Sequence, residues 1–463
     1  MCAPPTPAPP ADATKARNLR LAYAFTLAAG AARGVWSYAV LSGYLFVLTD
    51  SNTKVGLAEG AQGIAQCAFG LLAGWAADQF RRQTVCRVAA ILGVVASLGL
   101  ILAVATDDVS ARARFNYVTV GLSAFGAYQG CWSTALETLF ADSTTKGADR
   151  SEATARKFGL TLLATTAGPL LALILFFCLG DTWSLPALKT VAVVGLALCA
   201  PPALLLLGLR DVVSEACDDE ATEQGDENIA RWILLADLVS GFGSGMTVKF
   251  IPLFFKNRAG FSPVAANALS IGAALFMVGV AKCCERWSQR AGRARVCAGC
   301  MVLASLGLVG LAWADADSLV GVLHDEGPHL TSTLQRASAV ALYLLTCAQH
   351  ACRPLKKAAL NDHVPYHARG RWNALDGVTR FGWSGSAVLG GYLVDRGGYG
   401  LTFVVTALTQ LAAAAVWWRL VGRVDPVAPP VAGDLAAPLL EEAAPRARSA
   451  SFVVDDYSEM PRG

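Results

Sequence analysis

Charged side chains are scarce in this sequence. Only 16% of its 463 residues are Asp, Glu, Lys or Arg, whereas soluble domains carry about 25%. Hydrophobic residues make up 54% of the chain, and the mean hydropathy is +0.45. This composition excludes a disordered protein, a coiled coil and a typical cytosolic enzyme. It indicates a membrane protein that crosses the bilayer many times.

Several other features are missing. The formal net charge is only +3, which gives no basic excess for a nucleic-acid partner. The 13 cysteines are scattered along the chain and do not form the compact framework of a disulfide-rich secreted protein. The motifs HExxH and GxSxG are absent, and no helix pairs acids at catalytic spacing. We therefore expect no enzymatic activity, no metal and no organic cofactor.

Apolar segments that are each long enough for one crossing come in two groups of six. They lie at about 20–48, 55–77, 84–105, 116–141, 157–180 and 186–209, and at about 229–255, 263–282, 295–314, 337–358, 372–394 and 400–421. Such a duplicated layout is itself a repeat signal. The sequence predicts an all-α membrane protein with twelve transmembrane helices in two six-helix bundles, 20–209 and 229–421. An acidic linker at 210–228 joins the bundles, and disordered tails at 1–19 and 422–463 flank them.

Basic residues near the ends of the segments indicate the orientation, because Lys and Arg accumulate in cytoplasmic loops. If the N-terminus is cytoplasmic, the inner loops hold Arg81, Arg82, Arg87, Lys146, Arg150, Arg156, Lys157, Arg286, Arg290, Arg293, Arg295, Lys356, Lys357, Arg369 and Arg371. The outer loops hold about half as many: Lys54, Arg112, Arg114, Lys189, Lys256, Arg258, Arg336 and Arg396. We therefore predict that both termini are cytoplasmic.

The loop after the second segment carries a recognisable motif. Gly74, Asp78 and Arg82 match the pattern G-x-x-x-D-[RK]-x-G-[RK], and the equivalent loop of the second half carries a degenerate copy in Arg290, Gly292 and Arg293. This resembles the loop motif of the major facilitator superfamily, although Gln79 and Arg81 replace the family's basic residue and glycine. The resemblance covers about residues 20–421 and implies a transporter fold in which these residues act as a gating motif.

Two further motifs resemble parts of that superfamily. Gly159, Gly168 and Pro169 follow its antiporter motif G-x8-G-P, but the two glycines that should come next are missing. Gln129 and Gly130 are similar to the R-x-x-Q-G motif of proton-coupled drug exporters, with Gly126 in place of the arginine. These two partial motifs favour antiport slightly.

Polar side chains inside the apolar segments are candidates for a transport site, because an ionisable group at the bilayer centre costs about 2.5–3.5 kcal/mol on insertion scales. Arg33 lies near the middle of the first segment, and Glu137 lies in the inner third of the fourth. The seventh holds Asp237 and Lys249, with three alternating glycines (241, 243 and 245) between them that predict a weakened helix. The tenth presents one polar stripe of Thr346, Gln349, His350, Arg353 and Lys357.

These positions fall on the first, fourth, seventh and tenth segments, which line the central cavity in the superfamily. We predict a cavity for substrate and coupling ion lined by Arg33, Gln129, Glu137, Asp237, Lys249, Gln349, His350 and Arg353. For Glu137 and His350 a structural role is the alternative to proton transfer.

The sequence predicts a multi-pass, monomeric transporter that moves a small organic solute by alternating access, coupled to protons, with efflux favoured slightly. Proton-coupled uptake of an organic anion and a non-translocating receptor or scaffold are the alternatives. Substrate, direction, coupling ion and the identity of the membrane stay open. So does phosphorylation of the C-terminal tail, where Arg446, Arg448, Ser449 and Ser451 resemble a kinase target.

Overall fold

The computed structural model describes residues 11–144, 148–212, 226–315, 330, 332–364 and 369–424. For residues 11, 78, 148–151, 155, 361 and 369–381 it describes the backbone alone. The central part of the predicted linker, most of the predicted C-terminal tail and the serines of that tail lie outside the described residues.

The described chain is helical throughout and contains no strand. Its first half consists of α1 (Ala11–Trp36), α2 (Ala39–Thr49), α3 (Asn52–Gln79), α4 (Arg82–Ala105), α5 (Ala111–Asp142), α6 (Ala148–Cys178), α7 (Leu185–Ala197) and α8 (Ala200–Leu205). A short 3-10 helix, Leu206–Gly208, ends this half.

The second half consists of α9 (Glu227–Val248), α10 (Ile251–Ala259), α11 (Pro263–Ala291), α12 (Arg293–Ala314), α14 (Thr333–Thr346), α15 (Ala348–Ala351), α16 (Arg353–His363) and α17 (Arg369–Arg419). The last of these is two helices joined at a kink, because Gly397 and Gly398 have non-helical backbone angles.

Eight helical stretches of the described chain are long and apolar enough to cross a membrane. They include α4, α11 and α12, whereas α3 and α5 are not among them. The physical reason is visible in the sequence of α3, which carries Glu59, Gln62 and Gln66 among its apolar residues. A helix with polar side chains on an inner face has a lower mean hydropathy than one that meets only lipid.

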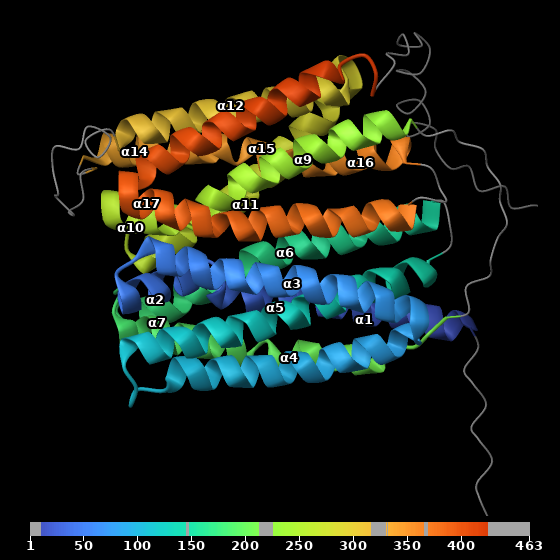
Figure 1. Cartoon of the computed structure of the whole chain (residues 1–463), viewed down its shortest axis with the longest axis horizontal. Coiled ribbons are helices and arrows are strands. Elements are labelled where there is room, and N and C mark those ends of the chain that lie inside the picture. Colours follow the sequence, from blue (N-terminus) through green and yellow to red (C-terminus); the bar gives the residue numbers. More distant parts are fainter. Residues whose placement is uncertain are drawn as a thin grey trace, which may run out of the picture. The chain divides into compact units, whose positions relative to one another are not determined.

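The long helices lie side by side along the horizontal direction of Figure 1. We call the end of the molecule at which α1 begins the near end, and the opposite end, at which α2 and α10 finish, the far end. At the far end, Asp50, Asp181 and Gly260 adopt positive φ angles where one helix gives way to the next. The chain therefore runs back and forth between these two ends.

Two expectations from the sequence differ from the structure. The first helix begins at Ala11, inside the predicted tail. The reason is packing, since Asn18 is buried and its amide donates to Ser143 Oγ (3.1 Å) and to the carbonyl oxygen of Arg210 (2.8 Å). Helix α9 also passes unbroken through its glycines. A Cβ at Gly245 would collide with the carbonyl oxygen of Trp383, so this glycine allows α9 and α17 to approach closely.

Candidate substrate cavity

A cavity of about 580 Å³ lies between the two halves of the chain. Helices α1, α5 and α6 line it from the first half, and α9, α11, α14 and α15 line it from the second. Its ionisable lining residues are Arg33, Glu137, Lys157, His350 and Arg353, and its aromatic ones are Phe25, Tyr38, Phe125, Tyr128, Trp132, Tyr343 and Trp383. Aromatic walls with a few polar groups are typical of small-molecule sites.

Arg33 extends from α1 toward α5. With its amide oxygen turned toward α1, Gln129 accepts hydrogen bonds from Arg33 Nε (3.0 Å) and Nη1 (3.2 Å). No ion pair joins Arg33 to a carboxylate among the described residues. The guanidinium is thus held by a neutral amide and forms no direct ion pair, although the Glu59 carboxylate acts on it electrostatically from a longer distance.

Gly126 explains why this cation comes from α1. A Cβ at Gly126 would collide with the carbonyl oxygen of Gln62, because α5 and α3 pack closely at this point. An arginine on α5 at this position has no room, whereas Arg33 on the neighbouring helix reaches Gln129. The two halves of the predicted R-x-x-Q-G motif therefore come together from different helices.

Most of the predicted polar stripe of the tenth segment faces the cavity, whereas Lys357 is exposed and does not line it. Thr346, Gln349, His350 and Arg353 all line it. The helical path is interrupted here between α14, α15 and α16, and Pro354 in the first turn of α16 has no backbone N–H to continue a helix. Gln349 accepts a hydrogen bond from Ser244 Oγ of α9 (3.1 Å), and the guanidinium of Arg353 lies 5.7 Å from the ring centre of Trp383.

Glu137 also lines the cavity, and it forms an ion pair with Lys157 of α6. The distance from Lys157 Nζ to Glu137 Oε1 is 2.7 Å, and the glutamate side chain is 59% exposed. Lys157 lies 4.5 Å from the ring centre of Phe140 as well. The carboxylate of Glu137 is therefore both paired and accessible from the cavity.

The structure places the remaining two predicted residues outside the cavity lining. Asp237 forms an ion pair with Lys356 of α16 (3.3 Å), and Lys249 forms one with Glu59 of α3 (2.7 Å). Each pair satisfies a charge within the membrane-spanning region. Among the described residues, no group of three His, Cys, Asp or Glu side chains is placed to hold a metal ion.

Glu59 is a residue that the sequence analysis missed. It is only 4% exposed and joins α3 of the first half to Lys249 of the second. The signal was present in the sequence, since Glu59 is an acid between Ala58 and Gly60 in an apolar segment. A Cβ at Gly60 would lie 2.5 Å from a side-chain carbon of Val388, so this glycine lets α3 pack against α17 next to the ion pair.

Asp395 closes the far end by capping a helix of the other half. Its carboxylate accepts hydrogen bonds from the backbone N–H groups of Asn52 (2.9 Å) and Thr53 (2.7 Å), which begin α3, and from Ser51 Oγ (2.9 Å). The first N–H groups of a helix have no partner within it, and they attract negative charge. This contact ties the kink of α17 to the start of α3.

Asp181 makes the equivalent contact in the opposite direction. Its carboxylate, after α6 of the first half, accepts from the backbone N–H of Val264 at the start of α11 (2.8 Å). Next to it, Trp183 Nε1 donates to the carbonyl oxygen of Phe261 (2.8 Å). Deeper in the molecule, Tyr38 and Tyr343 share a hydrogen bond across the two halves. The cavity is therefore covered on its far side by a layered set of contacts.

Comparison with known proteins agrees with this architecture. The family model described as Major Facilitator Superfamily matches residues 22–324. The chain belongs to the Major Facilitator Superfamily. It is a multi-pass membrane transport protein, as its apolar helices and its structural neighbours also indicate. No curated protein matches its sequence.

Solved structures of superfamily transporters superpose on nearly the whole described fold. An inward-facing bacterial homologue of the iron transporter ferroportin has a TM-score of 0.66 at 15% identity, over 88% of this chain and 99% of that one. A D-xylose-proton symporter has a TM-score of 0.67 at 14% identity, over 89% and 99%. The human organic anion transporter MFSD10 has a TM-score of 0.58 at 13% identity, over 87% and 99%. At these identities the similarity shows the fold alone.

The superfamily loop motif is built in the same way in both halves. Arg82 forms an ion pair with Asp142 at the end of α5, and Arg293 forms one with Asp362 at the end of α16 (2.5 Å). Gly292 has φ +86°, a conformation that favours glycine, so its place in the degenerate copy has a conformational reason. A Cβ added at Gly74 would lie 3.7 Å from a side-chain carbon of Thr134, which is an ordinary contact. Arg290 is exposed, and the side chain of Asp78 lies outside the description.

The antiporter-like residues have different surroundings. A Cβ at Gly168 would collide with the backbone of Gly34, so α6 and α1 touch beside Arg33. Pro169 lies within α6 and lines the cavity. Gly159 has no neighbouring atom that an added Cβ would meet within 4 Å. Gly168 and Pro169 thus shape the wall of the cavity, whereas Gly159 faces open space.

Proposed function

We propose that the chain is a secondary active transporter that moves a small organic anion by alternating access. The observation that carries the choice of an anion is Arg33, whose guanidinium lines the cavity and forms no direct ion pair with a carboxylate among the described residues. Arg353 adds a second cation, and the acid of the lining, Glu137, already pairs with Lys157. A guanidinium without a direct ion pair is suited to a carboxylate or phosphate, which it can bind through two parallel hydrogen bonds.

The proposed topology has twelve crossings in two bundles, 20–209 and 229–421, with both termini in the cytoplasm. Eight apolar stretches provide most of the crossings. The rest are α3, α5, the run α14–α16 and the first part of α17. The near end is then cytoplasmic, which agrees with the excess of Lys and Arg in its loops.

In this orientation the described state is closed to the outside. The contacts that support this reading are the two helix caps of Asp395 and Asp181 at the far end and the Glu59–Lys249 ion pair beneath them. Transport requires the two halves to separate there and to meet at the near end instead. The motif pairs Arg82–Asp142 and Arg293–Asp362 are located at the near end, where that second closure forms.

Glu137 and His350 are the proposed sites of proton coupling. Both line the cavity, and both side chains can change charge through protonation. Protonation of Glu137 breaks its ion pair with Lys157 and releases this lysine toward the substrate as a third cation beside Arg33 and Arg353. Asp237 is the remaining acid of the predicted set. Its ion pair with Lys356 depends on the position of α16.

Proton-driven exchange or efflux is the second candidate function. The observation in its favour is the Gly168–Pro169 pair, which matches the antiporter motif and forms the cavity wall beside Arg33. Substrate charge separates the two candidates, because an exporter of hydrophobic cations uses Glu137 as its counter-charge and does not need Arg33.

A ligand screen tests the choice. Purified protein is heated with small carboxylates, organic phosphates, hydrophobic cations and neutral sugars at about pH 5.5 and about pH 7.5. A ligand at about 100 times its Kd stabilises the folded state by about 2.7 kcal/mol. We expect stabilisation by organic anions that Arg33→Gln abolishes and that the exposed-site control Arg112→Gln retains. Stabilisation by hydrophobic cations alone would overturn the anion assignment.

A further inference from the structure

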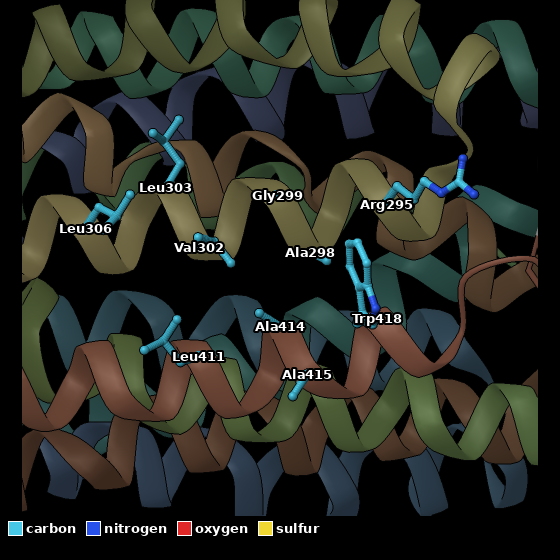
Figure 2. A pocket seen from close by; sticks show the side chains of 10 residues that line it. All are labelled: Arg295, Ala298, Gly299, Val302, Leu303, Leu306, Leu411, Ala414, Ala415 and Trp418. Carbon is cyan, nitrogen blue, oxygen red and sulfur yellow. The ribbon is translucent and has the colours of Figure 1, made fainter.

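A groove separate from the central cavity runs along the outer surface of the second half. It has a volume of about 490 Å³ and lies between α12 and the last part of α17. Figure 2 shows Arg295 and Trp418 at one end of this groove and Leu303, Leu306 and Leu411 toward the other. Leu306 is 61% exposed, so the groove opens to the surface that meets lipid.

Small residues make the floor of this groove. Ala298, Gly299, Ala414 and Ala415 stand where α12 and α17 face each other. An added Cβ at Gly299 would meet no atom within 4 Å. The hollow is therefore open space at the lipid-facing surface, wide enough for a hydrocarbon chain and lined by apolar side chains that suit one.

The end of the groove is positively charged. Arg295 is exposed and has no ion-pair partner among the described residues, whereas Arg293, two positions earlier, pairs with Asp362. Trp418 beside it is 66% exposed. Tryptophan is enriched at the membrane–water interface, and a basic pocket between helices on the cytoplasmic side binds anionic head groups.

The length of the groove matches one leaflet. The twelve residues from Arg295 to Leu306 span about 16 Å of helix, and half of the hydrocarbon core measures about 15 Å. A partner helix that crosses the bilayer would need a face about twice as long. An acyl chain that begins at the interface therefore fits this groove better than a transmembrane segment does.

We propose that this groove binds one anionic phospholipid of the near-end leaflet. Its phosphate contacts Arg295, its glycerol region lies against Trp418, and one acyl chain lies over Gly299 toward Leu306. In the proposed orientation this is the cytoplasmic leaflet, where anionic lipids concentrate. Because α12 and α17 belong to the bundle that carries His350 and Arg353, the lipid is bound to a moving part of the transporter.

Native mass spectrometry of the full chain tests this proposal without any transport assay. The detergent-solubilised protein is titrated with palmitoyl-oleoyl phosphatidylglycerol and, separately, with palmitoyl-oleoyl phosphatidylcholine. We expect the anionic lipid to bind about tenfold more tightly, because both lipids carry the same phosphodiester but only phosphatidylcholine adds a quaternary ammonium, which Arg295 repels. Arg295→Gln should remove this preference. Gly299→Leu should weaken binding of both lipids, because the added side chain fills the groove.

Gly99→Leu is the matched control, since Gly99 of α4 is exposed with no neighbour within 4 Å and lies in the other half. It should leave binding unchanged. Equal affinity for the two lipids, or unchanged preference in Arg295→Gln, would overturn the proposal. Displacement of the anionic lipid by millimolar inorganic phosphate would also overturn it, because the site would then bind free phosphate. Melting curves without added lipid confirm that each variant is folded.

Discussion

Glu59 Oε2 and Lys249 Nζ lie 2.7 Å apart across the boundary between the two halves of the transporter. Glu59 is 4% exposed, and Lys249 follows directly after α9. A charge buried in this way is tolerated only with a partner. The contact between the halves at this point therefore depends on the charge state of a buried side chain.

Loss of one partner should be more harmful than loss of both. Lys249→Met leaves the Glu59 carboxylate buried and unpaired, so we expect the free energy of unfolding to fall by about 3–5 kcal/mol. The double variant with Glu59→Gln should recover much of this loss. SDS-induced unfolding followed by circular dichroism measures all three variants. Additive effects of the two single substitutions would contradict a direct interaction.

The two helix caps at the far end should act locally and separately. Asp395→Ala removes the acceptor of the Asn52 and Thr53 amides, and Asp181→Ala removes that of Val264. Loss of a cap costs about 1 kcal/mol, so hydrogen–deuterium exchange should become about fivefold faster at the start of α3 in the first variant and at the start of α11 in the second. Each variant is the control for the other, and faster exchange at both sites in either one would argue against separate caps.

Gly292 should be sensitive to substitution for a conformational reason. At φ +86° and ψ +147° a non-glycine residue is strained by about 1–3 kcal/mol, so Gly292→Ala should lower the melting temperature. Gly279→Ala should not, because Gly279 lies inside α11 with no atom within 4 Å of an added Cβ, and alanine favours a helix. Equal melting temperatures of the two variants would exclude strain at Gly292.

Substitution of a proton-coupling residue should abolish proton-driven uptake without abolishing substrate exchange. In proteoliposomes, Glu137→Gln or His350→Gln should abolish uptake that a pH gradient drives while retaining exchange of labelled for unlabelled substrate, because exchange needs no net proton movement. Parallel assays of the two activities make the comparison. Full gradient-driven accumulation by both variants would show that neither side chain carries the coupled proton.

Much of the helical architecture could be predicted from the sequence, because long apolar segments leave few alternatives to a membrane helix. The loop motif and its degenerate copy also indicated that the second half repeats the first. Each copy contains a corresponding ion pair, Arg82–Asp142 in the first half and Arg293–Asp362 in the second. The predicted start of the first helix, at about residue 20, was wrong. The helix begins earlier because Asn18 is held by Ser143 and Arg210, which are both far away in the chain.

Partners of buried charges could not be predicted in the same way. Lys249 and Glu59 are separated by 190 residues, and their contact depends on how the halves meet. The glycines that predicted a weakened seventh segment do not interrupt α9, because Gly245 serves the close approach of α17. Glu59 itself was visible as an acid in an apolar segment, and attention to such residues on every segment would have found it.

The central claim is that Arg33 binds an organic anion that then crosses the membrane. Its most direct test is counterflow in proteoliposomes, with a panel of labelled small carboxylates and organic phosphates and with Arg33→Gln and Arg112→Gln as the paired variants. The account predicts exchange of at least one anion by the wild-type protein and by Arg112→Gln, and none by Arg33→Gln. Binding without exchange in the wild-type protein, or undiminished exchange in Arg33→Gln, would contradict it.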